Sequence, residues 1–244
     1  MNAVEGVKAL LIDSGAGWVL WLLAALSVAA LGVAIERWLF LRRQAARPDA
    51  LARLLDARLS RGEIEATAAE LGRSPAVAAR VAAVGLRLAP LGVESVERAM
   101  ESAVALERGV LERRVAFLGT LGNNAPFIGL FGTVIGVIHA FEELGRGATG
   151  HGAAGAAGAS QAVMTALAEA LVATAIGIAV ALPAIASFNV LQRRVALLLQ
   201  ETEAITSLVL AYLSAEGGRL VEVRRAGPTA SGRVELDAPA GEAG

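Results

Sequence analysis

Three long apolar stretches constrain this chain more than any other feature of its sequence. Residues 14–35 contain no charged side chain, residues 115–141 contain no Asp, Glu, Lys or Arg, and residues 160–191 contain one charged residue, Glu169. About 20 consecutive apolar residues are enough to cross the hydrocarbon core of a bilayer as an α-helix. Each stretch is longer and more apolar than the helices of a typical soluble bundle. The sequence therefore predicts three transmembrane helices in a lipid bilayer.

Composition excludes several other classes of protein. The formal net charge of −1 gives no basis for a nucleic-acid partner. There are no cysteines, and the two histidines, His139 and His151, are too few for a histidine-rich metal centre. The sequence also lacks a nucleophile–base arrangement and a phosphate-binding loop. We expect no metal, no cofactor and no enzymatic activity.

The first apolar stretch could be a cleaved signal peptide, but its charge pattern favours a retained anchor. A signal peptide begins with a basic segment and has a shorter apolar core. Here Lys8 is the only basic residue before the stretch, whereas Arg42 and Arg43 follow it. The pattern predicts a membrane anchor whose N-terminus lies outside the cytoplasm.

The distribution of basic residues predicts the orientation of all three spans. Short cytoplasmic segments of membrane proteins are enriched in Lys and Arg. Residues 42–114 contain 13 Arg and residues 192–244 contain six, whereas the segment between the second and third spans contains only Arg146. We therefore expect the N-terminus and this short segment on the periplasmic side, and the large loop and the C-terminus in the cytoplasm.

The predicted fold is all-α: an integral membrane protein with three transmembrane helices, two of which extend into a cytoplasmic helical bundle. Helical periodicity continues through residues 94–118 into the second span and from the third span to about Leu213, while breaks are expected at Gly62, 72–75 and 89–92. The predicted segments are a periplasmic amphipathic segment (1–13), transmembrane helix 1 (14–41), a cytoplasmic helical region (42–114), transmembrane helix 2 (115–142), a periplasmic Gly/Ala-rich loop (143–160), transmembrane helix 3 (161–191), a cytoplasmic helix (192–216) and a disordered tail (217–244).

Glu169 is the strongest candidate for a functional residue. A charged side chain at the bilayer centre costs about 2.5–3.5 kcal/mol on insertion scales, so such residues usually face a bundle interior or a water-filled path. A carboxyl group removed from water also tends to take up a proton. Glu169 is therefore a candidate for proton handling or ion pairing. The alternative is an interfacial glutamate that reaches the outer membrane surface.

Thr133 and Thr174 are the next candidates, because they fall in the same layer of the membrane as Glu169. A lone hydroxyl in a membrane helix often only bonds back to the carbonyl of the preceding turn, which is the alternative explanation. Glu169 and Thr174 are five residues apart, or about 140° around the helix axis. We therefore expect one of them to face a lumen and the other a neighbouring helix or subunit. His139, near the outer end of the second span, fits an interfacial histidine that could titrate.

Small residues and prolines recur in the second and third spans. Spacings such as Gly132-x-x-x-Gly136, and the one that places Gly177 between Ala173 and Ala181, allow close helix contact. Pro126 and Pro183 lie inside the spans, where neighbours or water can satisfy the freed carbonyls. Asn123 and Asn124 suggest a polar interior or an inner channel mouth. Three helices cannot both enclose a pore and hide these groups, so we expect a homo-oligomer.

The runs APFIGLFGTVIGVIHAF (125–141) and AEALVATAIGIAVALPAIASFN (168–189) resemble the MotA/TolQ/ExbB proton channel family, in particular its ExbB/TolQ branch. This resemblance implies a pentamer in the bacterial inner membrane whose second and third helices line a pore. Thr133, Glu169 and Thr174 match the family's polar pore residues, and Pro126 and Pro183 occupy its proline positions.

The resemblance also implies partners and a function. A single-span ExbD/TolR-like protein would sit inside the oligomer, and proton flow would drive motion passed to a TonB- or TolA-like protein spanning the periplasm, or to a gliding machinery. The resulting hypothesis is a proton-channel subunit that uses the proton motive force to energise outer-membrane transport, envelope maintenance or gliding motility. The alternative is a non-conducting oligomeric membrane scaffold that assembles and holds partner proteins.

Overall fold

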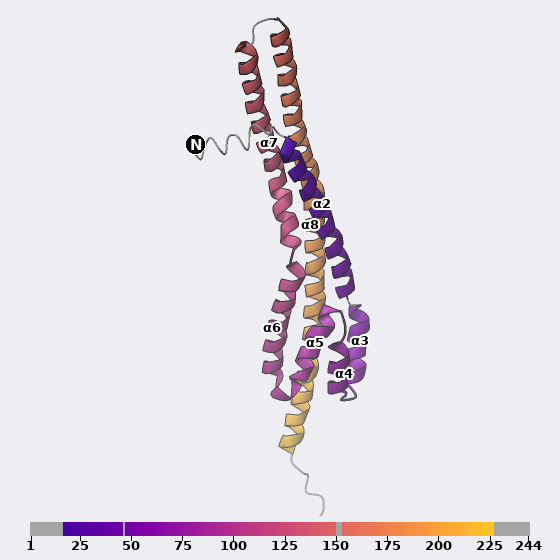
Figure 1. The fold of residues 1–244 in the computed structure, drawn as a ribbon. Coiled ribbons are helices and arrows are strands. Elements are labelled where there is room, and N and C mark those ends of the chain that lie inside the picture. The colour runs from indigo at the N-terminus through magenta and orange to yellow at the C-terminus, as the bar shows by residue number, and fades with distance from the viewer. Residues whose placement is uncertain (1–16, 46, 150–152, 227–244) are drawn as a thin grey trace, which may run out of the picture.

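The chain forms an elongated all-helical molecule, described here by a computed structural model for residues 17–45, 47–149 and 153–226 (Figure 1). Helices α7 and α8 run side by side along the upper part of the molecule, α2 lies against them lower down, and the short helices surround the lower part of α8 (Figure 1). The helices are α2 (Gly17–Gln44), α3 (Pro48–Leu59), α4 (Ile64–Leu71), α5 (Val77–Arg87), the 3-10 helix η1 (Ala89–Leu91), α6 (Val93–Glu112), α7 (Val115–Thr149) and α8 (Ala153–Ala226).

Three of these helices are long and apolar enough to cross a membrane, as the sequence predicted. They are α2, α7 and α8. Because α2 packs against both other helices, its buried side chains, among them Val19 and Leu23, lie on one side, while Trp21 and Val28 remain exposed on the other. An apolar exposed face is what a bilayer accommodates. The protein is therefore an integral membrane protein with three transmembrane helices.

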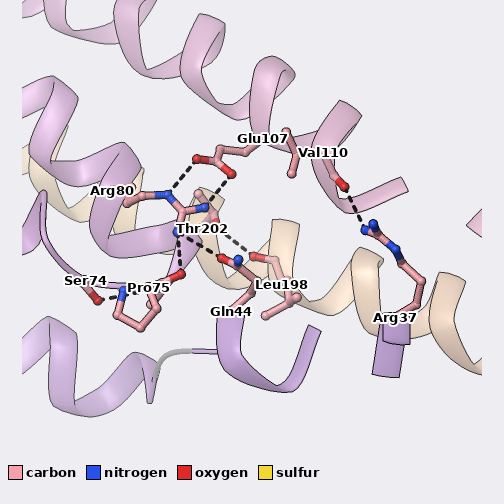
Figure 2. Close-up of polar contacts among 10 residues, drawn as sticks. Arg37, Gln44, Ser74, Pro75, Arg80, Glu107, Val110, Leu198 and Thr202 are labelled. Carbon is pink, nitrogen blue, oxygen red and sulfur yellow. Dashed lines mark hydrogen bonds and ion pairs between the residues drawn. The ribbon is translucent and has the colours of Figure 1, made fainter. Parts of the chain in front are cut away.

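The bundle beyond the membrane is held by an apolar core and by one polar cluster. Helix α5 buries almost every residue against its neighbours, from Val77 to Leu86. Figure 2 shows Arg80 of α5 donating through Nε and Nη2 to the two carboxylate oxygens of Glu107, at 2.9 and 2.6 Å, and through Nη1 to the side chain of Gln44 at 3.0 Å. This guanidinium links α5, α6 and the end of α2, so the bundle is fastened to the first transmembrane helix.

The helices of the bundle are interrupted at Gly62, at residues 72–75 and at 89–92, where breaks were predicted. Gly62 and Gly92 have φ angles of 75° and 93°. Glycine adopts these left-handed backbone conformations without the steric penalty that a Cβ introduces.

One prediction about this region is wrong: α6 and α7 are not a single continuous helix. The chain turns at Arg113 and Arg114, and Arg114 has a φ of 64°. Two contacts with α2 lie at the turn. Arg114 pairs with Glu36 at 2.7 Å. Figure 2 shows the second contact, in which Arg37 Nη1 donates to the carbonyl oxygen of Val110 at 3.4 Å. The last four carbonyls of a helix lack intrahelical partners, and a basic group there is favourable. These long-range contacts stabilise the break.

Helix also extends into the segments predicted as a loop and as a tail. Helix α7 continues to Thr149 and α8 begins at Ala153, so helix replaces most of the segment predicted as a loop at 143–160. Alanine has the highest helix propensity, so the six alanines of this segment favour helix although its glycines do not. Helix α8 also continues through 217–226, the first part of the predicted tail. The predicted segment 1–13 and residues 227–244 lie outside the described residues.

Candidate functional site

The interface between α7 and α8 brings the two backbones into direct contact. A Cβ placed on Gly129 would lie 2.7 Å from the carbonyl oxygen of Ala173, and one placed on Gly177 would lie 2.7 Å from the carbonyl oxygen of Ala125. No real Cβ tolerates these distances, and a backbone atom cannot rotate away. Glycine is therefore required at both positions for the helices to approach this closely.

Gly132 and Gly136 continue the same interface toward the α7–α8 connection. A Cβ on Gly132 would lie 2.8 Å from the Cβ of Ala173 and 3.2 Å from Val19 of α2, so three helices meet at this level. A Cβ on Gly136 would lie 2.5 Å from the Cβ of Ala170. These contacts establish an antiparallel register in which Gly136 is level with Ala170.

Pro126 and Pro183 lie inside α7 and α8. Proline lacks the amide hydrogen that would bond to the carbonyl four residues earlier, so the carbonyls of Gly122 and Ala179 lose their usual intrahelical donor. Pro126 is half-buried and Pro183 is exposed.

Glu169 is exposed in the single chain and opens onto a groove between α7 and α8. This groove, called here the His139 groove, has a volume of about 520 Å³. Its polar lining residues are His139 and Glu143 from α7 and Gln161, Thr165 and Glu169 from α8. The register around Gly136 and Ala170 places the groove on the side of the interface nearer the α7–α8 connection.

Thr174 faces a different direction from Glu169. Its hydroxyl oxygen is buried without a hydrogen-bond partner, and its Cα would be 3.0 Å from a Cβ on Gly129 of α7. Thr174 therefore lies at the helix interface while Glu169 faces the His139 groove, a divergence that matches the 140° expected from their spacing. Thr133 is half-buried and donates its hydroxyl hydrogen to the carbonyl oxygen of Leu130 at 2.6 Å. Thr133 thus bonds to a carbonyl of the preceding turn of its own helix, which was the alternative explanation considered for a lone hydroxyl.

A second polar groove, the Asn123 groove, lies toward the opposite end of the interface and has a volume of about 460 Å³. Its polar residues are Thr120, Asn123 and Asn124 of α7 and Asn189 and Gln192 of α8. The amide nitrogen of Asn124 donates to the carbonyl oxygen of Thr120 at 2.7 Å. Side-chain amides accept and donate hydrogen bonds without carrying charge, which suits a hydrated opening.

The sequence analysis identified two of these five polar residues. It singled out Asn123 and Asn124 but not Asn189 or Gln192. Asn189 is an amide at the end of an apolar run and carries the same signal as Asn123, but its proximity to Asn123 depends on the register of two helices. Within the described residues, no group of three or more His, Asp or Glu side chains is arranged to hold a metal ion.

These features define a class of protein: a helical membrane protein with three spans and a helical bundle beyond the membrane. Two of its spans form an antiparallel pair packed through glycines, with a polar groove toward each end of their interface. The sequence profile of the MotA/TolQ/ExbB proton channel family matches residues 73–204, more than half of the chain. The matched segment runs from the bundle through α7 and most of α8. The chain belongs to the MotA/TolQ/ExbB proton channel family.

Individual relatives place it near the ExbB/TolQ branch. It is 43% identical over 107 residues to the Tol-Pal system protein TolQ of Haemophilus influenzae, a match covering 42% of each chain. It is 40% identical over 101 residues to TolQ of Pseudomonas aeruginosa, covering 40% of this chain and 38% of that one. It is 42% identical over 96 residues to the biopolymer transport protein ExbB of Xanthomonas campestris, covering 39% of this chain and 35% of the relative. The chain thus spans less than half the length of each of these relatives.

Proposed function

We propose that this protein is a proton-channel subunit of an inner-membrane motor that draws on the proton motive force. Its role is not enzymatic. It works with an ExbD/TolR-like single-span partner and energises outer-membrane transport, envelope maintenance or gliding motility. Membership of the family and the similarity to proteins named TolQ and ExbB support this proposal.

The observation that supports it most strongly is the exposure of Glu169 on an apolar helix. Leu171 and Leu182 of the same helix are 71% and 64% exposed in the single chain, as expected for residues that lipid or another subunit covers. A carboxylate in such surroundings is tolerated only with a proton, a counter-charge or water. Glu169 together with Thr133 and Thr174 is the proposed proton pathway, and Pro126, Gly132, Gly136, Gly177 and Pro183 shape and pack the two helices around it.

The proposed assembly is a homo-oligomer, a pentamer by analogy with the family. One α7–α8 pair does not surround Glu169, so neighbouring copies and the partner helix would have to supply the remaining walls of a pathway. The motion would be transmitted to a TonB- or TolA-like protein spanning the periplasm, or to a gliding machinery.

The proposed orientation follows the distribution of basic residues. Segments 14–41, 115–142 and 161–191 cross the membrane, with the N-terminus and the α7–α8 connection in the periplasm. Segments 42–114 and 192–216 lie in the cytoplasm together with the C-terminus. The His139 groove then opens toward the periplasm and the Asn123 groove toward the cytoplasm.

The second candidate function is a non-conducting scaffold that assembles and holds partner proteins. The glycine-packed interface and the large exposed apolar faces would serve it equally well. In this case Glu169 pairs with a partner's charge and no proton crosses the membrane.

Proton flux into vesicles separates the two functions. Wild-type protein is reconstituted with its single-span partner, and flux is driven by a membrane potential. The Glu169→Gln variant keeps the shape of the side chain and removes its charge, while Glu203→Gln makes the same change at an exposed position further along α8. The proposal expects flux from the wild type and Glu203→Gln, and none above background from Glu169→Gln. Undiminished proton flux in both Glu169→Gln and Thr174→Val would mean that neither residue belongs to the proton pathway.

A further inference from the structure

Two ionisable side chains, and no others, occur in the three apolar stretches at 14–35, 115–141 and 160–191: His139 and Glu169. They belong to different helices, and nothing in the sequence requires them to meet. In the structure both line the His139 groove. The contact between Gly136 and Ala170 fixes their levels, because His139 is three residues beyond Gly136 and Glu169 directly precedes Ala170. Three residues correspond to about 4.5 Å along a helix axis, so the two groups lie within about one helical turn of the same level.

We propose that His139 is a proton relay between the aqueous phase at the α7–α8 connection and the carboxylate of Glu169. This inference rests on the proposed function and names a further residue of the same pathway. Imidazole is the side chain whose ordinary titration falls between pH 5 and 8, and its two nitrogens let it accept a proton on one side and release one on the other.

The transfer conserves protons and forms no covalent intermediate. A hydronium ion in the groove gives a proton to the unprotonated ring nitrogen of His139, which becomes an imidazolium. The imidazolium then donates a proton to a carboxylate oxygen of Glu169, directly or through one water molecule. The ring returns to its neutral form and Glu169 becomes a neutral carboxylic acid, ready to pass the proton on.

The remaining groups of the groove fit this role. Glu143 lies one helical turn beyond His139 on α7 and is the other titratable group in the lining; it pairs with Arg146. From α8, Gln161 and Thr165 contribute neutral hydrogen-bonding groups on the connection side of Glu169, where they can hold water that leads to His139.

The first test compares the pH dependence of proton flux in the reconstituted complex. The variant is His139→Gln, and the matched control is His151→Gln, which makes the same change at the other histidine of the chain. A positioned acid–base group contributes about 10²–10⁴-fold to a proton transfer. We expect His139→Gln to lower flux at least tenfold and to abolish the dependence on external pH between 5 and 8, with His151→Gln behaving like the wild type.

The outcomes separate failure of the relay from failure of the channel. Wild-type flux and pH profile in His139→Gln, combined with lost flux in Glu169→Gln, would overturn the relay and leave the proposed function standing. Unchanged flux in Glu169→Gln would overturn both. Equal losses in His139→Gln and His151→Gln would also overturn the relay.

Thiol labelling at position 139 tests water access to the relay and does not require a variant that conducts protons. The chain contains no cysteine, so His139→Cys carries a single reactive thiol. A relay residue must be in contact with external water. We expect a membrane-impermeant thiol reagent added to intact cells or spheroplasts to label His139→Cys from the periplasmic side. Absence of labelling in a membrane-inserted variant that is labelled after detergent solubilisation would overturn the relay.

Discussion

Substituting Gly129 by alanine tests the close packing of α7 and α8. The added methyl group would lie 2.7 Å from the carbonyl oxygen of Ala173 and 3.0 Å from the Cα of Thr174, and both are backbone atoms. Neither atom can move without displacing α8. Gly145, on the same helix, has nothing within 4 Å of the corresponding position. Gly145→Ala is therefore a matched control.

The magnitude follows from comparing the two variants. Alanine in place of glycine inside a helix is intrinsically favourable by about 0.5–1 kcal/mol, and both variants share this gain. Overpacking a tight contact costs about 1–3 kcal/mol. The free energy of unfolding should therefore be about 1–3 kcal/mol lower for Gly129→Ala than for Gly145→Ala.

Denaturant titration of the purified protein in detergent micelles measures this difference, with helix content followed by circular dichroism. Size-exclusion chromatography of the same samples shows whether assembly is retained. Equal stability of Gly129→Ala and Gly145→Ala would refute the backbone contact between α7 and α8.

Three further substitutions test separate parts of the molecule. Arg80→Met removes the bidentate ion pair with Glu107, whose side chain is only 19% exposed, and should lower the free energy of unfolding by about 1–3 kcal/mol; a double-mutant cycle with Glu107→Gln should return a coupling energy clearly above zero. Arg37→Met removes the buried charge beside the carbonyl of Val110 and should cost up to about 2 kcal/mol in the same titration, whereas an unchanged midpoint would mean that this charge does not stabilise the end of α6. Thr174→Val removes a buried hydroxyl that lacks a partner within the chain, so it should stabilise the isolated subunit by about 1 kcal/mol while proton flux falls; undiminished flux would remove Thr174 from the pathway.

Much of the fold could be predicted from the sequence because it depends on local composition. The spans follow from apolar runs of sufficient length, and the breaks in the bundle follow from Gly62 and Gly92. The turn at Arg114 could not be predicted, because the helical pattern continues through it and no Gly or Pro marks it. Its ion pair joins it to Glu36, 78 residues earlier in the chain, and sequence periodicity contains no information about such a contact.

The candidate site shows the same division. The spacing of Gly132 and Gly136 predicts a close helix contact, and the 140° between Glu169 and Thr174 predicts that they face different directions. Which direction each one faces depends on the register between α7 and α8, which the contacts of Gly129 and Gly136 establish in three dimensions. For the same reason, only the structure shows that His139 and Glu169 line one groove and that Asn123 and Asn189 line another.

Infrared difference spectroscopy of the reconstituted complex observes the proposed proton carrier itself. Switching the membrane potential on and off should produce a reversible band from the carbonyl stretch of a protonated carboxylic acid. This band should be present in the wild type and in Glu203→Gln and missing in Glu169→Gln. A band that persists unchanged in Glu169→Gln would assign the moving proton to another group, and Glu169 would not be the proton carrier.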